Sequence, residues 1–373
     1  MTDRRHIVGV MTGTSLDGID AALVQVDGHG LEMNASLARH QAGPLGPARE
    51  SLQRLASGEP LTAATYAQAG RELGEACAEV AATAANNTSP DLVAVHGQTV
   101  HHAPPDSLQI LNPAPIARRL RCPVFFDLRA ADLAAGGQGA PITPLADWVL
   151  FRSEVPTTVI NLGGFCNLTH LPAVGSPDAT PSSIRAEDVC PCNHVLDTAA
   201  RELLDRPFDA EGEVASRGQA DDRIAATIAT QLRPESAQGR SLGTGDEGRA
   251  VVDAIRSMSR PEDALATLVS GIATAILDRV PHDTRKIILA GGGARNATLF
   301  RAMEHLRPGT VCSTDLFGIH VQAREAVAMG VLGALALDGV PLTLPYVTGR
   351  PTDSVFDGSW CLPRRLSDQS VES

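Results

Sequence analysis

The stretch that decides the fold is GVMTGTSLDGIDAALVQVD, Gly9–Asp27. Apolar, β-branched residues predict two strands, His6–Met11 and Ala21–Asp27, which pair as a β-hairpin. The turn between them gathers glycine, hydroxyl and carboxylate groups. Glycine lets backbone N–H groups approach a phosphate, and the polar side chains supply donors and metal ligands. The turn is therefore either a phosphate-binding loop or simply a tight connection.

Similar glycine-rich turns follow two later strands. Val155–Leu162 leads into GGFCN (163–167) and a further strand, Leu168–Leu171, whereas Lys286–Ala290 leads into GGGARN (291–296). Three such turns, each behind an apolar strand, favour nucleotide binding over a tight connection. None of the three matches a Walker P-loop or the dinucleotide motif G-x-G-x-x-G.

Strands alternate with helices along the chain, which predicts an α/β fold. Residues 136–144 and 173–186 are expected to lack regular structure. The further predicted strands are Asp91–His96, Ser107–Leu111 and Pro123–Leu128. The predicted helices lie within Pro47–Ala85 and at Pro115–Leu120, Asn193–Leu204, Asp221–Leu232, Asp263–Val280 and Ala323–Leu337.

The bulk composition excludes several classes of protein. The chain has 373 residues, 43% of them hydrophobic and 20% charged, which predicts a globular protein of two domains. Its net charge of −12 argues against nucleic acid or an anionic membrane as a partner. We expect no membrane span and no signal peptide. The seven cysteines are expected to be reduced thiols in the cytoplasm.

Several sequence motifs occur in order along nearly the whole chain. They are MTGTSLDGID (11–20), VHGQTVHH (95–102), DLRAADLAAGGQGAPITP (127–144), INLGGFCNLT (160–169), DALATL (263–268), AGGGARNATL (290–299) and VTG (347–349). Together they resemble the anhydro-N-acetylmuramic acid kinase family, and GTSLDGID with GGQGAP is the most specific combination. The resemblance implies a two-domain fold of the actin/hexokinase type, ribonuclease H-like, with the active site in the inter-domain cleft.

The resemblance also implies the domains and the nucleotide site. Residues 1–130 with about 345–373 would form one lobe, and residues 131–344 the other. ATP and Mg²⁺ would be required, with Asp17 and Asp20 holding the metal ion through water. The residues implied to bind the nucleotide are Gly13, Thr14, Ser15, Leu16, Asp17, Gly18, Ile19, Asp20, Gly163, Gly164, Asn167, Gly291, Gly292, Gly293 and Asn296.

The family places its catalytic aspartate in a D-T-G-P-G-N segment, and this chain reads D-V-C-P-C-N from Asp188 to Asn193. The resemblance therefore implies that Asp188 is the general base. A carboxylate within hydrogen-bond reach of a water molecule can take its proton during attack. From the residues alone, the favoured interpretation of Asp188 is a cap of the helix predicted from Asn193.

Two cysteines, Cys190 and Cys192, stand where the family has glycine. Glycine permits positive φ and close ligand approach, so we expect the loop path or the bound substrate to differ. With His194 they could also be read as zinc ligands, although such a site needs a fourth ligand and usually wider spacing. A further departure, on the sugar side, is Asp147, where the family often has histidine.

The resemblance implies a sugar site formed by His96, Gln98, Thr99, Arg129 and Glu325. Arg129 suits a carboxylate such as a lactyl group, because guanidinium pairs with carboxylate in a bidentate manner. A surface or inter-domain salt bridge is the alternative for Arg129. His96 and Gln98 follow a predicted strand, where α/β folds commonly bind ligands. A core histidine bonded to a backbone carbonyl is the alternative for His96.

The implied activity belongs to peptidoglycan recycling. In it, 1,6-anhydro-N-acetylmuramic acid, ATP and water give N-acetylmuramic acid 6-phosphate and ADP. A homodimer is implied by the resemblance alone. One alternative is a kinase for a hydroxyl of another sugar-like acceptor, such as a different anhydrosugar or a nucleoside-type biosynthetic intermediate. A second is a sugar- or nucleotide-binding protein without turnover, against which the presence of Asp17, Asp20 and Asp188 argues.

Overall fold

The hairpin predicted around GTSLDG is confirmed and starts the first of two large sheets. The computed structural model describes residues 4–13, 16–177, 179–232, 248–351 and 356–363. In it, β1 (Arg4–Thr12) pairs antiparallel with β2 (Ile19–Asp27). Strand β2 pairs antiparallel with β3, and β1 pairs parallel with β4. The six-stranded sheet has the order β13-β7-β4-β1-β2-β3, in which the further strands are β3 (Asn34–Gly43), β4 (Leu92–His96), β7 (Val124–Phe126) and β13 (Ser359–Cys361).

The second sheet repeats this topology. Its strand order is β10-β9-β8-β11-β12, and β8 pairs antiparallel with β9 but parallel with β11. Its strands are β8 (Thr157–Leu162), β9 (Phe165–Leu171), β10 (Arg185–Pro191), β11 (Lys286–Ala290) and β12 (Val311–Ser313). Two copies of one order, three antiparallel strands followed by two parallel ones, confirm the predicted two-domain, ribonuclease H-like fold.

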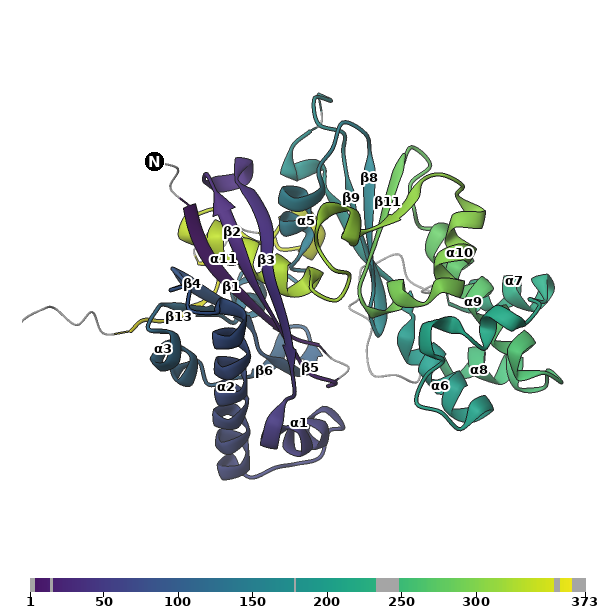
Figure 1. Cartoon of the computed structure of the whole chain (residues 1–373), viewed down its shortest axis with the longest axis horizontal. Helices are drawn as coiled ribbons and strands as arrows, with labels where there is room; N and C mark the ends of the chain where they lie inside the picture. The colour runs from purple at the N-terminus through teal and green to yellow at the C-terminus, as the bar shows by residue number, and fades with distance from the viewer. Residues whose placement is uncertain (1–3, 14–15, 178, 233–247, 352–355, 364–373) are drawn as a thin grey trace, which may run out of the picture.

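Helices cover both sheets and fill the second lobe (Figure 1). A small hairpin of β5 (Gln98–Ala103) and β6 (Asp106–Ile110) projects from the first lobe. The helices are α1 (Arg49–Ala56), α2 (Ala63–Ala85), α3 (Ala114–Leu120), α4 (Leu128–Ala134), α5 (Pro144–Phe151), α6 (Asn193–Leu204), α7 (Asp222–Gln231), α8 (Arg249–Arg256), α9 (Pro261–Leu277), α10 (Ala297–Leu306), α11 (Arg324–Leu337) and α12 (Pro345–Thr348).

The first sheet is enclosed by two helices from opposite ends of the chain. Helix α2 packs on β1, β2 and β3, whereas α11 packs on β1, β2 and β4. Helix α11 lies so close to β1 that a Cβ at Gly9 would overlap the Ala326 carbonyl oxygen. Helix α11 lies within residues 131–344, which were expected to form the second lobe, and it packs on the first sheet.

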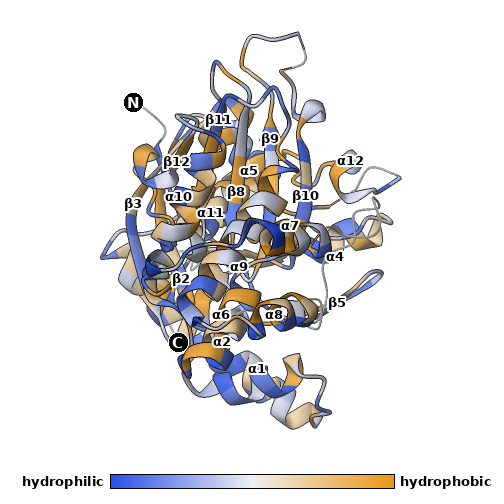
Figure 2. Cartoon of the chain, turned by 90° about the vertical axis from the view of Figure 1, so that its right-hand side faces the viewer, coloured by the Kyte–Doolittle hydropathy of each residue, from blue (hydrophilic) through white to orange (hydrophobic). Residues whose placement is uncertain are grey.

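The second lobe has its own core around α9, which contacts α6, α7, α8 and α10 (Figure 2). Between the lobes lies α5, which contacts β3 of one sheet and β8 and β9 of the other. The hydrophobic core is continuous through this junction, because Ile7 and Val159 belong to one cluster. The junction between the lobes is therefore packed. Within the residues that the structure describes, no helix is both long and apolar enough to cross a membrane.

Strands β3 and β10 are among those that correct the predictions. Strand β3 was not predicted, and β10 begins inside residues 173–186, for which a loop was expected. Both are edge strands whose outer residues are largely polar, as Figure 2 shows for β3. An edge strand is held by the hydrogen-bond ladder of its single neighbour, so its sequence needs no continuous apolar run.

Candidate active site

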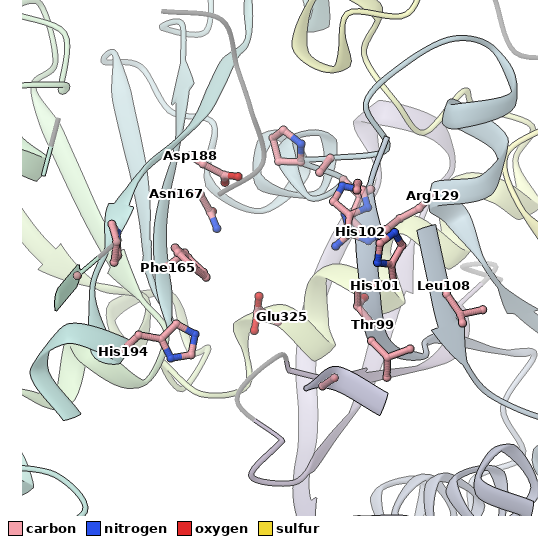
Figure 3. A pocket seen from close by; sticks show the side chains of 18 of the residues that line it. Thr99, His101, His102, Leu108, Arg129, Phe165, Asn167, Asp188, His194 and Glu325 are labelled. Carbon is pink, nitrogen blue, oxygen red and sulfur yellow. The ribbon is translucent and has the colours of Figure 1, made fainter. Parts of the chain in front are cut away.

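A cavity of about 1560 Å³ lies between the lobes, as the resemblance implied. The first lobe supplies the end of α1 and the β5–β6 hairpin, and residues 138 and 140–143 line the cavity from the segment between α4 and α5. The second lobe supplies parts of β9, β10, α6 and α8. Figure 3 shows Asp188 and Asn167 on one wall, Arg129 and Thr99 on the other, and Glu325 of α11 between them.

Asp188 belongs to β10 and points into this cavity (Figure 3). It lies opposite Asn167 of β9 in the strand register, and the register shifts between Asp188 and Cys190. Such an irregularity re-aims a side chain at the edge of a sheet. The alternative role as a helix cap is wrong, because the residue that precedes α6 is Cys192. The strand therefore holds Asp188 where a bound substrate can reach it.

The cysteines of this segment face the core. Cys190 and Cys192 are buried with Cys166 in the hydrophobic core of the second lobe, and burial raises the pKa of the Cys190 thiol to about 12. Both cysteines have negative φ, so neither adopts the left-handed backbone that favours glycine. The cavity wall contains Asp188 and His194 but neither thiol. The expectation that these cysteines reshape the pocket therefore finds no support in the structure.

A zinc site is not present among the described residues, in which no group of three or more histidine, cysteine, aspartate or glutamate side chains could hold a metal ion. All seven cysteines are free thiols in the structure.

Arg129, at the start of α4, is fixed on two sides. Its Nε donates to His96 Nε2 at 3.2 Å, and its Nη1 donates to the carbonyl oxygen of Gly139 at 2.8 Å. Burial lowers the pKa of Arg129, whereas the negative charges of Asp188 and Glu325 raise it. Arginine stays protonated regardless. Arg129 thus donates to the neutral ring of His96 and to a backbone carbonyl oxygen. These contacts replace the salt bridge that was the alternative interpretation.

Glu325 lies in the first turn of α11 and contacts the second lobe. Asn161 Nδ2 donates to Glu325 Oε1 at 3.3 Å. Burial raises the pKa of Glu325, and so does the charge of Asp20, whereas Arg324, Asn161 and Arg129 lower it. Asn161 was missed from the sequence, although an asparagine inside the apolar strand β8 is the kind of buried polar residue that needs a partner.

His96 and Gln98 lie behind the cavity wall. His96 is 3% exposed, and its Nε2 receives hydrogen bonds from Arg129 and, at 3.2 Å, from Gln109. Burial, and then the charge of Arg129, lower its pKa to about 3, so the ring is neutral. Gln98 is fully buried and donates to the carbonyl oxygen of Gly13 at 3.0 Å. Of the predicted sugar residues, Thr99, Arg129 and Glu325 line the cavity.

The first turn presents one exposed carboxylate. Asp17 is exposed, whereas Asp20 Oδ1 lies 2.7 Å from Nε2 of His40. Thr14 and Ser15 lie outside the described residues. Burial, and less strongly the charge of Asp17, raise the pKa of Asp197 on α6, against the opposing effect of Arg201. Carboxylates from the two lobes therefore approach each other near this turn.

The second turn adjoins the glycine loop at 291–296. Gly291 has φ +81°, and a Cβ there would lie 2.8 Å from the carbonyl oxygen of Leu162. The oxygen of the Asn296 side chain accepts from the N–H groups of Thr298 and Leu299, so it caps α10. Among the residues predicted to bind the nucleotide, Asn167 lies in the cavity wall.

Asp147 does not face the sugar. It is completely buried and forms a two-pronged ion pair with Arg324, in which Nε lies 3.1 Å from Oδ1 and Nη2 contacts Oδ2. Thr169 Oγ1 donates to the same carboxylate at 2.9 Å. The pair joins α5 to α11 and β9 next to Glu325, so this departure from the family pattern belongs to the junction between the lobes.

The cavity has further polar residues that sequence reasoning missed. His102 lines it from β5, and burial, followed by the charge of Arg129, lowers the pKa of His102 to about 4. His194 lines it from α6, with its ring against Phe165 at a centroid distance of 5.1 Å. His102 lies in the motif VHGQTVHH, and this motif could have identified it as a candidate site residue.

The chain is similar to several solved structures. One is the (R)-2-hydroxyglutaryl-CoA dehydratase component A of Acidaminococcus fermentans, with a TM-score of 0.44, 11% identity, and 88% of this chain and 98% of that chain covered. Another is a ROK family glucokinase from Streptomyces griseus in complex with glucose and AMPPNP, with a TM-score of 0.40, 14% identity, and coverage of 88% and 99%.

Among curated proteins the similarity is much stronger. The chain is 37% identical to the anhydro-N-acetylmuramic acid kinase of Salinibacter ruber over 383 aligned positions, covering 93% of this chain and 94% of the relative. It is 38% identical to the protein of the same name from Rhodopseudomonas palustris over 371 positions, covering 92% and 95%.

The duplicated fold, the inter-lobe cavity and these relatives place the chain among the ATP-dependent sugar kinases. The family model called anhydro-N-acetylmuramic acid kinase matches residues 5–359. The chain belongs to that family.

Proposed function

We propose that the protein converts 1,6-anhydro-N-acetylmuramic acid, ATP and water to N-acetylmuramic acid 6-phosphate and ADP. The observation that carries the proposal is the position of Asp188, on the wall of the inter-lobe cavity opposite Arg129, with Glu325 between them (Figure 3). One carboxylate that can accept a proton and one fixed guanidinium meet the needs of a sugar that bears an acidic side chain.

The proposed chemistry joins two bond changes. Asp188 accepts a proton from water as the water oxygen bonds to the anomeric carbon, and the bond from that carbon to O6 breaks. O6 then bonds to the γ-phosphorus, and ADP leaves with the electrons of the broken phosphoanhydride bond. Arg129 binds the lactyl carboxylate. Glu325 accepts hydrogen bonds from sugar hydroxyls, and the Thr99 hydroxyl forms hydrogen bonds with them.

Mg²⁺ fits the carboxylates of the first turn. Mg²⁺ usually takes one or two carboxylates together with substrate phosphates and water. Asp17 is exposed and close enough to raise the pKa of Asp197, and a cation would relieve that repulsion. Asp17 and Asp197 are therefore the ligands that we propose, with Asp20 engaged by His40 beside them. The ion would neutralise charge on the ATP phosphates.

The proposal extends to setting and architecture. We infer a cytoplasmic enzyme of peptidoglycan recycling that forms a homodimer and binds neither nucleic acid nor membrane, on the strength of the family and the acidic composition. We also propose residues 4–130 with about 324–363 as the first lobe. This boundary departs from the one expected at about 345, because α11 packs on the first sheet.

The test is a coupled assay of ADP release with Mg²⁺–ATP and the anhydrosugar, with the product identified by mass spectrometry. The Asp188→Asn variant should lose turnover and still bind ATP. The matched control is Glu187→Gln on the same strand, whose carboxylate pairs with Arg279 and which should stay active.

Wild-type protein that binds ATP but leaves this sugar unchanged would refute the proposed substrate. Other anhydrosugars and nucleosides would then be assayed as acceptors. Turnover in Asp188→Asn equal to wild type would refute the proposed base.

A further inference from the structure

A second aspartate, Asp132, lies buried behind the wall that carries Arg129. It belongs to α4 and is completely inaccessible to solvent. Its Oδ2 accepts the N–H of Gly139 at 2.8 Å, and its Oδ1 accepts the Thr348 hydroxyl at 2.7 Å. Arg350 Nε lies 3.7 Å from the same Oδ1. Both carboxylate oxygens are therefore used by groups from other parts of the chain.

Gly139 connects this carboxylate to the cavity. Its N–H bonds to Asp132, and its carbonyl oxygen accepts Nη1 of Arg129 at 2.8 Å. Residues on both sides of it, Gln138 and Ala140, line the cavity. The direction of the Gly139 peptide thus depends on Asp132, and one of the two contacts that hold the Arg129 guanidinium depends on that peptide.

The chain near Thr348 holds the same loop from the other side. Gln138 N donates to the Thr348 carbonyl oxygen at 2.8 Å, and Arg350 Nη2 donates to the Thr343 carbonyl oxygen at 2.9 Å. A Cβ at Gly137 would overlap the Asp132 carboxylate, so the loop passes directly over it. These contacts join GGQGAP to VTG, although some 200 residues separate them along the chain (136–141 and 347–349).

The guanidinium keeps donors for a ligand. Of its five N–H groups, Nε–H and one on Nη1 are used by His96 and Gly139 within the described structure. The hydrogen bond from Nη1 to the Gly139 carbonyl oxygen fixes the orientation of the guanidinium plane. It therefore also fixes the direction in which Nη2 points. A bidentate partner needs that direction to be correct, because such pairs are geometrically demanding.

We propose that Asp132 is a positioning residue, which acts through Gly139 to aim Arg129 at the acidic group of the substrate. The inference rests on the proposed function for the identity of that group, but not for the contact between the loop and Arg129. Asparagine at position 132 would offer one acceptor where two donors now converge.

The kinetic test compares Asp132→Asn with wild type. We expect KM for the anhydrosugar to rise about tenfold, with KM for ATP unchanged, because charge-assisted hydrogen bonds are lost on the sugar side only. In the Arg129→Ala background, Asp132→Asn should have no further effect on that KM. Equal effects on both substrates, or additive effects of the two substitutions, would overturn the proposal.

A second test needs no turnover. The Nε–Hε signal of Arg129 in a ¹⁵N correlation spectrum, assigned by its loss in Arg129→Lys, reports the bond to His96. In Asp132→Asn it should shift and exchange with water several-fold faster. An unchanged signal would refute the positioning role. If the wild type were inactive on the anhydrosugar, the proposed function would fail while this measurement still decided the role of Asp132.

The matched control is Asp209→Asn. Asp209 also uses both oxygens to hold a loop, accepting the N–H groups of Val214 and Ala215 at 2.9 and 3.0 Å, but in the second lobe. It should leave the Arg129 signal and both KM values unchanged. If Asp132→Asn does not fold, Thr348→Val removes one donor to Asp132 and should move the same readouts in the same direction, with Thr348→Ser restoring them.

Discussion

The turns of the two hairpins occupy equivalent places in the repeated fold, yet they are held in different ways. The first turn depends on side chains. Gln98 donates to the Gly13 carbonyl oxygen, and Thr12 Oγ1 donates to the carbonyl oxygen of His96 at 3.1 Å. These links tie the turn to the end of β4 and to the start of β5, next to the wall that carries Arg129.

The second turn is held by backbone groups at the start of α6. The Gly164 carbonyl oxygen accepts the N–H of Cys192 at 2.8 Å and of His194 at 3.3 Å, and the Gly163 carbonyl oxygen accepts the N–H of Asn193 at 3.1 Å. These bonds anchor the segment that follows Asp188. The comparison teaches that three backbone hydrogen bonds join the turn next to the proposed base to the start of α6, whereas two side-chain hydrogen bonds join the turn with the exposed carboxylate to its neighbouring strands.

The largest expected effect concerns the strand beside the second turn. In Asp188→Asn, kcat should fall about 10³-fold, because general-base catalysis contributes roughly 10²–10⁴-fold and the amide cannot accept the proton. KM for ATP and the melting temperature should stay near wild type, as measured by steady-state kinetics and thermal unfolding. A fall in melting temperature that matches the loss of rate would show that Asp188 supports the fold instead.

The next effect tests the backbone packing behind the second turn. Gly291→Ala should reduce the free energy of unfolding by about 2–4 kcal/mol, since it adds a clash with Leu162 to a positive φ. Gly309→Ala is the matched control, because φ there is +71° and no atom lies within 4 Å of the added Cβ. It should cost about 1–2 kcal/mol. Equal losses in urea denaturation would mean that the packing at Gly291 is unimportant.

The first turn should respond to the loss of its exposed carboxylate. Asp17→Asn should raise KM for Mg²⁺–ATP about tenfold, equivalent to about 1.4 kcal/mol, with partial recovery at high Mg²⁺ concentration. The exposed Asp222→Asn on α7 serves as the control. Magnesium titrations that coincide for wild type and Asp17→Asn would remove Asp17 from the metal site.

The last effect concerns the support of the first turn and depends on pH. The folded pKa of His96 is about 3, below its ordinary value of 6.5, so the unfolded chain binds the proton more readily in acid. Its contribution to stability is therefore complete above about pH 6.5 and decreases as pH falls, by at most about 1.4 kcal/mol per pH unit. In His96→Gln the free energy of unfolding should fall less steeply between about pH 6.5 and pH 4.

That measurement uses urea denaturation at several pH values, with His305→Gln on the end of α10 as the control. Parallel pH curves for wild type and His96→Gln would show that the ring is already accessible to protons in the folded state.

Much of this molecule could be predicted from its sequence. The apolar strands β1, β2, β4, β8 and β11 were predicted because buried central strands have continuous hydrophobic runs. Strands β3 and β10 were not predicted, because an edge strand is held by hydrogen bonds to its single neighbour and needs no continuous apolar run. Asp188 was placed by a motif, but its position on a strand depends on pairing with β9, which no local pattern encodes.

The residues of the candidate site were likewise only partly predictable from the sequence. Thr99, Arg129 and Glu325 line the cavity as the resemblance implied, while His96 and Gln98 support it from behind. The motif VHGQTVHH contains both kinds of residue, so proximity in sequence cannot separate a residue that lines the cavity from one that lies behind its wall. Asn161 and Asp132 were missed because their partners are distant in sequence.

The close packing of α11 on β1 has a consequence for biosynthesis. Residues 157–313, which contain all five strands of the second sheet, emerge from the ribosome before Arg324–Leu337. The second lobe can therefore complete its core while one face of the first sheet still lacks its helix. The first lobe begins with β1 at the start of the chain but is completed only when α11 has been synthesised, so its apolar strands stay uncovered during most of translation. Chaperone binding to nascent chains should therefore concentrate on β1 and β4 until Leu337 is released.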